Sequence, residues 1–91
     1  MLTLAEIQIG MSRLNEWSLD GQSVTKEWEF KHFKEAVAFI NKVSETAEKN
    51  NHYPTVFLDK TRVRLILTTE YERALSEKDF QLAEELDKIS T

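Results

Sequence analysis

The chain has 91 residues, of which 41% are hydrophobic and 31% charged, a balance typical of a folded domain. Its 12 basic and 16 acidic residues give a formal net charge of -4, which disfavours binding to nucleic acids or anionic lipid. The chain has no cysteine, which excludes disulfides and thiolate metal sites. The first residues contain no basic region and no long apolar run, so we expect a cytoplasmic protein without a membrane anchor.

A first helix is predicted to begin at about Thr3 and to end near Asn15. Thr3 and Glu6 have the spacing of a capping box, and Leu2 and Ile7 occupy the positions of a hydrophobic staple. Apolar residues then recur at helical spacing, and we expect them to form one buried stripe: Leu4, Ile7, Met11 and Leu14.

From Trp17 onward the pattern changes to a period of two, which predicts a β-hairpin turning at Asp20-Gly21. One face of its second strand carries Val24, Lys26, Trp28 and Phe30. Lys26 interrupts that apolar face, so we expect the end of this strand to lie at a sheet edge where the lysine reaches water. Trp28 is interpreted as a core residue.

A long amphipathic helix follows, and it should be the principal helix that packs on the sheet. Its predicted buried stripe consists of Phe33, Ala36, Val37, Ile40, Val43 and Ala47. Asn50-Asn51 favours the end of the helix, and Pro54 forces the residue before it into an extended conformation. The chain is therefore predicted to leave the helix at His52.

A second hairpin is predicted from Val56 onward, with a turn at Asp59-Lys60. Its second strand should bury Val63, Leu65, Leu67 and Thr69. The last helix follows Ser76 and Asp79, which have cap spacing, while Leu75 and Phe80 can form a staple. Its predicted apolar stripe consists of Leu82, Ala83, Leu86 and Ile89.

The predicted order is therefore α-β-β-α-β-β-α within a single domain that spans residues 1–91. Two hairpins joined by a helix favour an α+β fold, with a four-stranded antiparallel sheet and helices packed on one face.

Three segments of this pattern resemble the pterin-4a-carbinolamine dehydratase family. They are Glu48-Lys49-Asn50-Asn51-His52-Tyr53-Pro54, Leu65-Ile66-Leu67-Thr68-Thr69-Glu70 and Leu75-Ser76-Glu77-Lys78-Asp79. Trp17 and the segment Phe30-Lys31-His32-Phe33 are also similar to the family, so the resemblance covers essentially the whole chain.

The family's motif has two adjacent histidines before a proline and a third histidine after the threonine that ends the last strand. His52 matches the first of these histidines. Tyr53 stands at the second position, Glu70 at the third, and Lys60 at a position where an aromatic residue is usual. The resemblance thus predicts the fold more completely than the site.

The resemblance implies loss of water from a 4a-hydroxytetrahydropterin, which gives the quinonoid dihydropterin in tetrahydrobiopterin recycling. One group must protonate the departing hydroxyl and another must accept the proton of the ring nitrogen. Imidazole suits both tasks because its reference pKa of about 6.5 leaves both forms available near neutrality. His52 is therefore the principal catalytic candidate, with no metal and no cofactor, since the pterin is the substrate.

Glu70 and Tyr53 complete the catalytic candidates. Glu70 could serve as a second acid or base if burial raised its pKa from about 4.3, or it could be a solvated carboxylate at a strand end. Tyr53 could donate a hydrogen bond, stack on the pterin or simply pack at the surface. By resemblance, Glu48, Thr68 and Thr69 are expected to contact the substrate.

His32 could cap or pack at the start of the long helix, because two histidines alone lack the ligand spacing of a metal site. The alternative to an enzyme is a non-catalytic member of the family that acts as a dimerisation, interaction or assembly factor for another protein. The small core, the sheet edges and the family's habit favour a homodimer or homotetramer.

Overall fold

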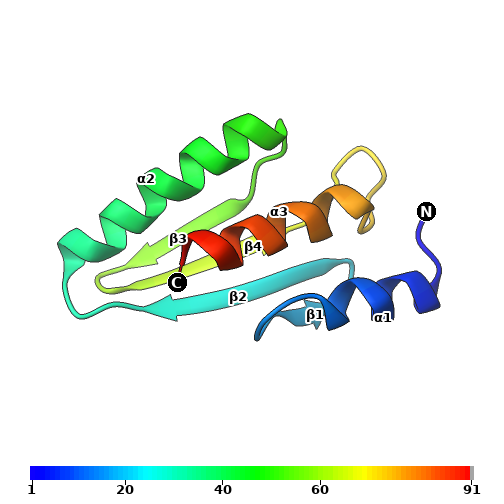
Figure 1. The fold of residues 1–91 in the computed structure, drawn as a ribbon, viewed down its shortest axis with the longest axis horizontal. Coiled ribbons are helices and arrows are strands. Elements are labelled where there is room, and N and C mark those ends of the chain that lie inside the picture. Colours follow the sequence, from blue (N-terminus) through cyan, green and yellow to red (C-terminus); the bar gives the residue numbers. More distant parts are fainter. Residues whose placement is uncertain (91) are drawn as a thin grey trace.

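The computed structural model describes residues 1–90, which form the elements in the expected order (Figure 1). They are α1 (Leu4–Ser12), β1 (Ser18–Asp20), β2 (Ser23–Glu29), α2 (Phe33–Asn50), β3 (Thr55–Asp59), β4 (Arg62–Leu67) and α3 (Glu77–Ile89). Both predicted hairpins and all three predicted helices are confirmed. Within residues 1–90, no helix is long and apolar enough to cross a membrane.

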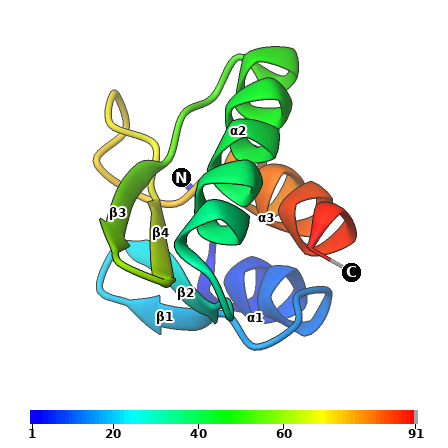
Figure 2. The same cartoon turned by 90° about the vertical axis from the view of Figure 1, so that its left-hand side faces the viewer.

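The four strands form one antiparallel sheet in the order β1-β2-β4-β3. The two central strands therefore come from different hairpins, and Trp28 of β2 lies opposite Val63 of β4. All three helices lie on the same face of the sheet, as the view along its strands shows (Figure 2). The predicted α+β architecture is confirmed.

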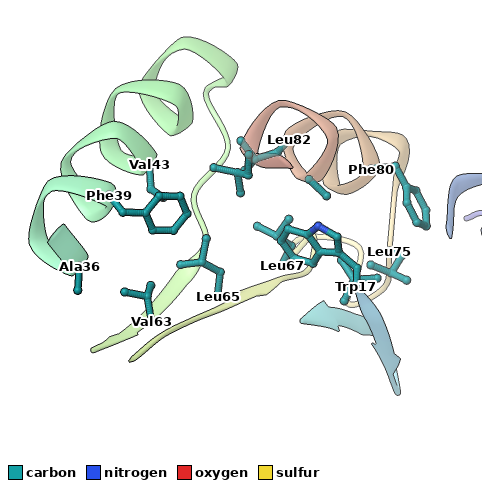
Figure 3. Packing of buried hydrophobic residues seen from close by; sticks show 13 residues of the cluster. Trp17, Ala36, Phe39, Val43, Val63, Leu65, Leu67, Leu75, Phe80 and Leu82 are labelled. Atoms are coloured by element: carbon teal, nitrogen blue, oxygen red, sulfur yellow. The ribbon is translucent and has the colours of Figure 1, made fainter. Parts of the chain in front are cut away.

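The core lies between this sheet face and the helices (Figure 3). Alternate residues of β4, namely Val63, Leu65 and Leu67, are fully buried, as a period of two requires. Phe80, Leu82 and Leu86 cover them from α3. The predicted burial of the second strand of the second hairpin is thus confirmed, as is that of the last helix, of whose predicted stripe only Ile89 is partly buried.

In α1 the predicted cap is confirmed, but one residue of the predicted stripe is exposed. The Thr3 hydroxyl accepts a hydrogen bond from the Glu6 backbone, and the Glu6 carboxylate accepts one from the Thr3 backbone. The prediction that Leu4 is buried is wrong, because its side chain is 69% exposed. The buried face of α1 is centred on Gly10, which packs against Phe80, and this rotation places Leu4 at its margin.

In α2 the buried face is likewise rotated relative to the predicted stripe. Phe33 was expected to be buried and is 59% exposed, whereas Phe39 is only 4% exposed. The ring of Phe39 packs against Trp28 and Phe30 of the first hairpin, with centroid distances of 4.9 and 5.3 Å. These aromatic contacts fix the rotation of the helix, and they also confirm Trp28 as a residue packed against the core.

Lys26 does not reach water as expected, although β2 lacks a β1 partner at this position. Its side chain is 8% exposed, and its ammonium group lies 2.8 Å from the carboxylate of Asp87 in α3. It also donates a hydrogen bond to the Asn15 carbonyl, and the Trp17 indole donates one to the same Asp87 carboxylate. An ion pair across the domain therefore takes the place of the predicted solvation.

Candidate functional site

The end of α2 and the start of α3 meet at one end of the sheet. Asn51 adopts the left-handed conformation with φ 50°, which ends α2 as the sequence predicts. The His52 backbone amide then donates a hydrogen bond to the Ala47 carbonyl, 3.2 Å away. This turn directs the chain toward β3 and places the His52 imidazole beside the first turn of α3.

The carboxylate of Asp79 holds the His52 imidazole. Its Oδ1 lies 2.6 Å from Nε2 of His52. The side chain of Asp79 is completely buried and that of His52 is 11% exposed. The two side chains are therefore almost completely shielded from solvent, although the residues are 27 positions apart in the sequence.

Thr69 and Ser76 complete the shell around this carboxylate. Asp79 Oδ2 accepts hydrogen bonds from the Thr69 hydroxyl at 2.8 Å and from the Ser76 backbone amide at 2.9 Å. Thr69 has only one hydroxyl proton, so in its 2.6 Å contact with the Ser76 hydroxyl it is the acceptor and Ser76 the donor. A chain of hydrogen bonds thus runs from Ser76 through Thr69 to Asp79.

This arrangement sets the tautomer of His52. An ionised carboxylate can only accept hydrogen bonds, so the neutral imidazole carries its proton on Nε2 and leaves Nδ1 as a proton acceptor. The chemistry of this pair is that of an oriented general base.

His52 opens onto a pocket of about 260 Å³ that most of the sequence-predicted site residues share. Its walls are Asn51, His52, Tyr53, Thr68, Thr69, Glu70, Tyr71 and Lys78. Five of the six predicted site residues are therefore brought together. Glu48, the sixth, is not among the residues that line this pocket.

Glu48 instead forms a hydrogen bond with Tyr53. The Tyr53 hydroxyl donates a 2.8 Å hydrogen bond to the Glu48 carboxylate, and both residues are exposed. This hydrogen bond raises the pKa of Tyr53 above its ordinary value, because it stabilises the protonated phenol next to a negative charge. Tyr53 and Glu48 also line a neighbouring, mostly apolar pocket of about 180 Å³. Tyr53 therefore lines both this pocket and the His52 pocket.

Glu70 begins the loop that connects β4 to α3. Thr69 and Ala74 form an isolated antiparallel bridge at the base of this loop, which Figure 1 shows between β4 and α3. Glu70 is exposed, so the burial on which its predicted acid–base role depended is absent. It lines the same pocket as His52, as an exposed side chain at the end of the strand.

Asp79, Tyr71, Lys78 and Asn51 belong to the site but were not predicted as site residues from the sequence. Asp79 was interpreted as a helix cap and as part of a segment that resembles the family, but no role at the site was assigned to it. Its contact with His52 depends on how α3 packs. Tyr71 and Lys78 line the pocket but lie on a loop and a helix turn without a periodic pattern. Across the part of the chain that is described, no group of three or more histidine, cysteine, aspartate or glutamate residues could hold a metal ion.

Comparison with known proteins agrees with the resemblance over nearly the whole chain. The family model described as "Pterin 4 alpha carbinolamine dehydratase" matches residues 1–89. A protein of Trichormus variabilis that bears the name "Putative pterin-4-alpha-carbinolamine dehydratase" is 38% identical over 86 residues, covering 94% of this chain and 92% of its own length.

Solved structures show the same fold. A transcriptional coactivator/pterin dehydratase from Brucella melitensis superposes with a TM-score of 0.92 at 30% identity, over 99% of this chain and 98% of its own. A pterin dehydratase-like protein identified as a RuBisCO assembly factor in the alpha-carboxysome has a TM-score of 0.72 at 17% identity, covering 86% of this chain and 93% of its own. That second likeness concerns the fold alone. The chain therefore belongs to the pterin-4a-carbinolamine dehydratase family.

Proposed function

We propose that the protein is a pterin-4a-carbinolamine dehydratase that removes water from a 4a-hydroxytetrahydropterin. The observation that carries this proposal is the His52 imidazole, oriented by the buried Asp79 carboxylate at the wall of a pocket. The family and the names of the relatives support the reaction class. The pterin is the substrate, and the proposed reaction requires no cofactor.

The reaction breaks the bond between C4a and its hydroxyl oxygen, forms a double bond between C4a and N5, and releases the N5 proton. The departing hydroxide needs one proton and N5 loses one, so the step is balanced without an oxidant or reductant. One imidazole can perform both transfers: Nδ1 of His52 accepts the N5 proton and then delivers it to the leaving oxygen. Asp79 stabilises the imidazolium between these transfers.

This scheme explains how catalysis is compatible with Tyr53 and Glu70 at the family's other histidine positions. His52 alone performs the proton transfers in this scheme, while Glu70 and Tyr53 form part of the pocket wall. The backbone of Thr68, which lines the pocket, can form hydrogen bonds with the edge of the pterin. The backbone of Thr69 is already bonded to Glu72 and Ala74, so Thr69 contributes to the pocket wall only.

A dehydration assay with matched histidine variants tests the proposal. The purified protein should accelerate dehydration of 4a-hydroxytetrahydropterin above the rate in buffer, followed by ultraviolet absorbance of the dihydropterin. His52→Ala should lower kcat by about 10²-fold or more, the usual contribution of a general acid–base group. The chain's only other histidine, His32, is exposed at the start of α2, so His32→Ala should retain wild-type activity.

Two results would contradict this assignment. One is a wild-type rate equal to that of buffer from protein whose circular dichroism spectrum is that of the folded state. The other is undiminished activity in His52→Ala. An inactive protein that binds no pterin and captures one specific protein partner would instead support the non-catalytic alternative.

We further propose that the protein is a cytoplasmic homo-oligomer, a dimer or a tetramer. β3 is paired only with β4 and forms one edge of the sheet. Every residue of β3 is exposed, including Val56, Phe57 and Leu58. A free strand edge with apolar side chains is a surface that natural proteins normally cover, and a second copy of the same strand can pair with it.

A further inference from the structure

We propose that Tyr71 is a specificity-determining residue of the His52 pocket, whose ring stacks on the substrate more strongly as the substrate becomes flat. This inference rests on the proposed function and adds a residue that the histidine motif does not contain. Tyr71 lines the pocket together with Tyr53, so two aromatic residues line the same pocket as His52. Its side chain is 74% exposed and therefore does not serve the core.

A backbone bridge closes the base of the loop that carries Tyr71. Thr69 and Ala74 exchange backbone hydrogen bonds at the base of the loop, and Arg73 adopts the left-handed conformation with φ 52°. Thr69 is itself buried and bound to Asp79. The loop that carries Tyr71 is thus attached to the same carboxylate that orients His52.

Lys78 supports the ring. Its ammonium nitrogen lies over the Tyr71 ring, 5.4 Å from the centroid, in a cation–π contact. The lysine lies over one face of the phenol and itself lines the pocket, so in this proposal a planar ligand stacks on the opposite face. Lys78 directly precedes Asp79 in the chain, so this contact also connects Tyr71 to the first turn of α3.

The change in shape of the substrate during the reaction would allow stacking on Tyr71 to contribute to catalysis. In the 4a-hydroxytetrahydropterin C4a is tetrahedral and its hydroxyl projects from the ring, which prevents close stacking on that face. As water leaves, C4a becomes trigonal and the bicyclic ring flattens. A stacking contact that strengthens along this path binds the transition state more tightly than the substrate, and such contacts raise kcat.

Binding of two pterins that differ in ring shape tests the inference. Biopterin is flat, whereas tetrahydrobiopterin carries the same side chain on a puckered ring, and isothermal titration gives the Kd of each. Tyr71→Ala should weaken biopterin binding by about ten-fold or more, the usual loss when a stacking ring is removed, and should weaken tetrahydrobiopterin binding clearly less. Tyr71→Phe, which keeps the ring, should bind both ligands like the wild type.

A matched control and a second variant separate stacking from general damage. Phe33 is an exposed aromatic residue of α2 outside the pocket, so Phe33→Ala should leave both Kd values unchanged. Lys78→Met should cause a smaller loss of biopterin affinity than Tyr71→Ala, because the ring remains. Equal losses for the two pterins, wild-type affinity in Tyr71→Ala, or no binding of biopterin by the wild type would each overturn the inference.

The dehydration assay on the same preparations distinguishes this inference from the proposed function. A wild type that dehydrates the substrate while Tyr71→Ala keeps an unchanged kcat would remove the role of Tyr71 and leave the enzyme assignment intact. Selective loss of biopterin binding in Tyr71→Ala, from a protein that does not accelerate dehydration, would keep the stacking wall and remove the enzymatic role. A fall in kcat that exceeds any rise in KM is the expected result.

Discussion

At the scale of single residues, the contact between His52 and Asp79 joins the chemistry of the site to the stability of the fold. Asp79 is completely buried, and its two carboxylate oxygens accept hydrogen bonds from His52, from the Thr69 hydroxyl and from the Ser76 backbone amide. A change in this carboxylate should therefore affect both properties.

Asp79→Asn should impair both activity and stability. The amide that replaces one carboxylate oxygen would face a donor, either His52 Nε2–H or the Thr69 hydroxyl, inside a buried site. We expect the free energy of unfolding to fall by about 1–3 kcal/mol, measured by urea denaturation, and the dehydration rate to fall with it.

Asp59→Asn is the matched control for this substitution, because Asp59 is an exposed carboxylate at the end of β3. It should change neither the free energy of unfolding nor the dehydration rate. Full activity in Asp79→Asn would show that the carboxylate does not act through His52.

The pair of His52 and Asp79 also shows why the site could be predicted only in part. The sequence identifies His52 because it precedes Tyr53 and Pro54 at the end of a helix. Its partner Asp79 lies 27 residues away, and its cap spacing explains its presence without any contact to a histidine. The contact depends on how α3 packs, which the spacing of residues does not specify.

The Tyr53 phenol should lose its proton at a higher pH than an ordinary tyrosine. Tyr53 and Tyr71 are the only tyrosines, so Tyr71→Phe leaves one phenol whose pKa can be followed by phenolate absorbance. That pKa should lie above 10.0, and Glu48→Gln should lower it by removing the charged acceptor. Glu45→Gln, an exposed change in the same helix, should leave it unaltered.

The sign of the linked stability follows from the raised pKa of Tyr53. The protonated phenol is favoured in the folded state, so the contact with Glu48 stabilises the fold at pH values below the ordinary pKa of tyrosine. That contribution is lost as the pH rises through the raised pKa. An unchanged phenol pKa in Glu48→Gln would mean that the hydrogen bond does not form in solution.

At the scale of elements, the helices and strands could be predicted from spacing, but the rotation of the helices could not. Leu4 and Phe33 fit the apolar stripes and are nevertheless exposed, whereas Phe39 is buried. The stripes show only which residues are apolar. The rotation of α1 depends on the close approach of Gly10 to Phe80, and that of α2 depends on the aromatic rings around Phe39. Such contacts join segments distant in the sequence.

Gly10→Ala should destabilise the protein even though alanine favours helices. A methyl group at Gly10 would lie 2.7 Å from a ring carbon of Phe80, which is fully buried and cannot move away freely. Overpacking costs about 1–3 kcal/mol and the helix preference returns about 1 kcal/mol, so we expect a net loss of about 1 kcal/mol by urea denaturation.

An exposed position of α1 provides the comparison for Gly10. Gln8→Ala adds no contact with α3 and should change the free energy of unfolding by at most about 0.5 kcal/mol. A gain in stability in Gly10→Ala would mean that α1 does not approach Phe80 as closely as the structure indicates.

At the scale of the whole molecule, the exposed edge of β3 favours assembly, and light scattering should give a mass of at least two chains across the micromolar range. Leu58→Lys places a charge on that edge and should shift the assembly toward the monomer. Leu4→Lys, a charge at an exposed leucine of α1, is the matched control and should leave the mass unchanged. A monomer for the wild type throughout this range would contradict the proposal.

The ion pair of Lys26 with Asp87 has a consequence for how the domain opens. Asn15 and Trp17, in the connection between α1 and β1, also form hydrogen bonds with this pair. The connection is therefore bonded to the last turns of α3. Neither region can detach without leaving a largely buried charge unpaired, so both should become accessible to hydrogen exchange in the same event. The two ends of the chain would thus behave as one cooperative unit, although most of the sequence lies between them.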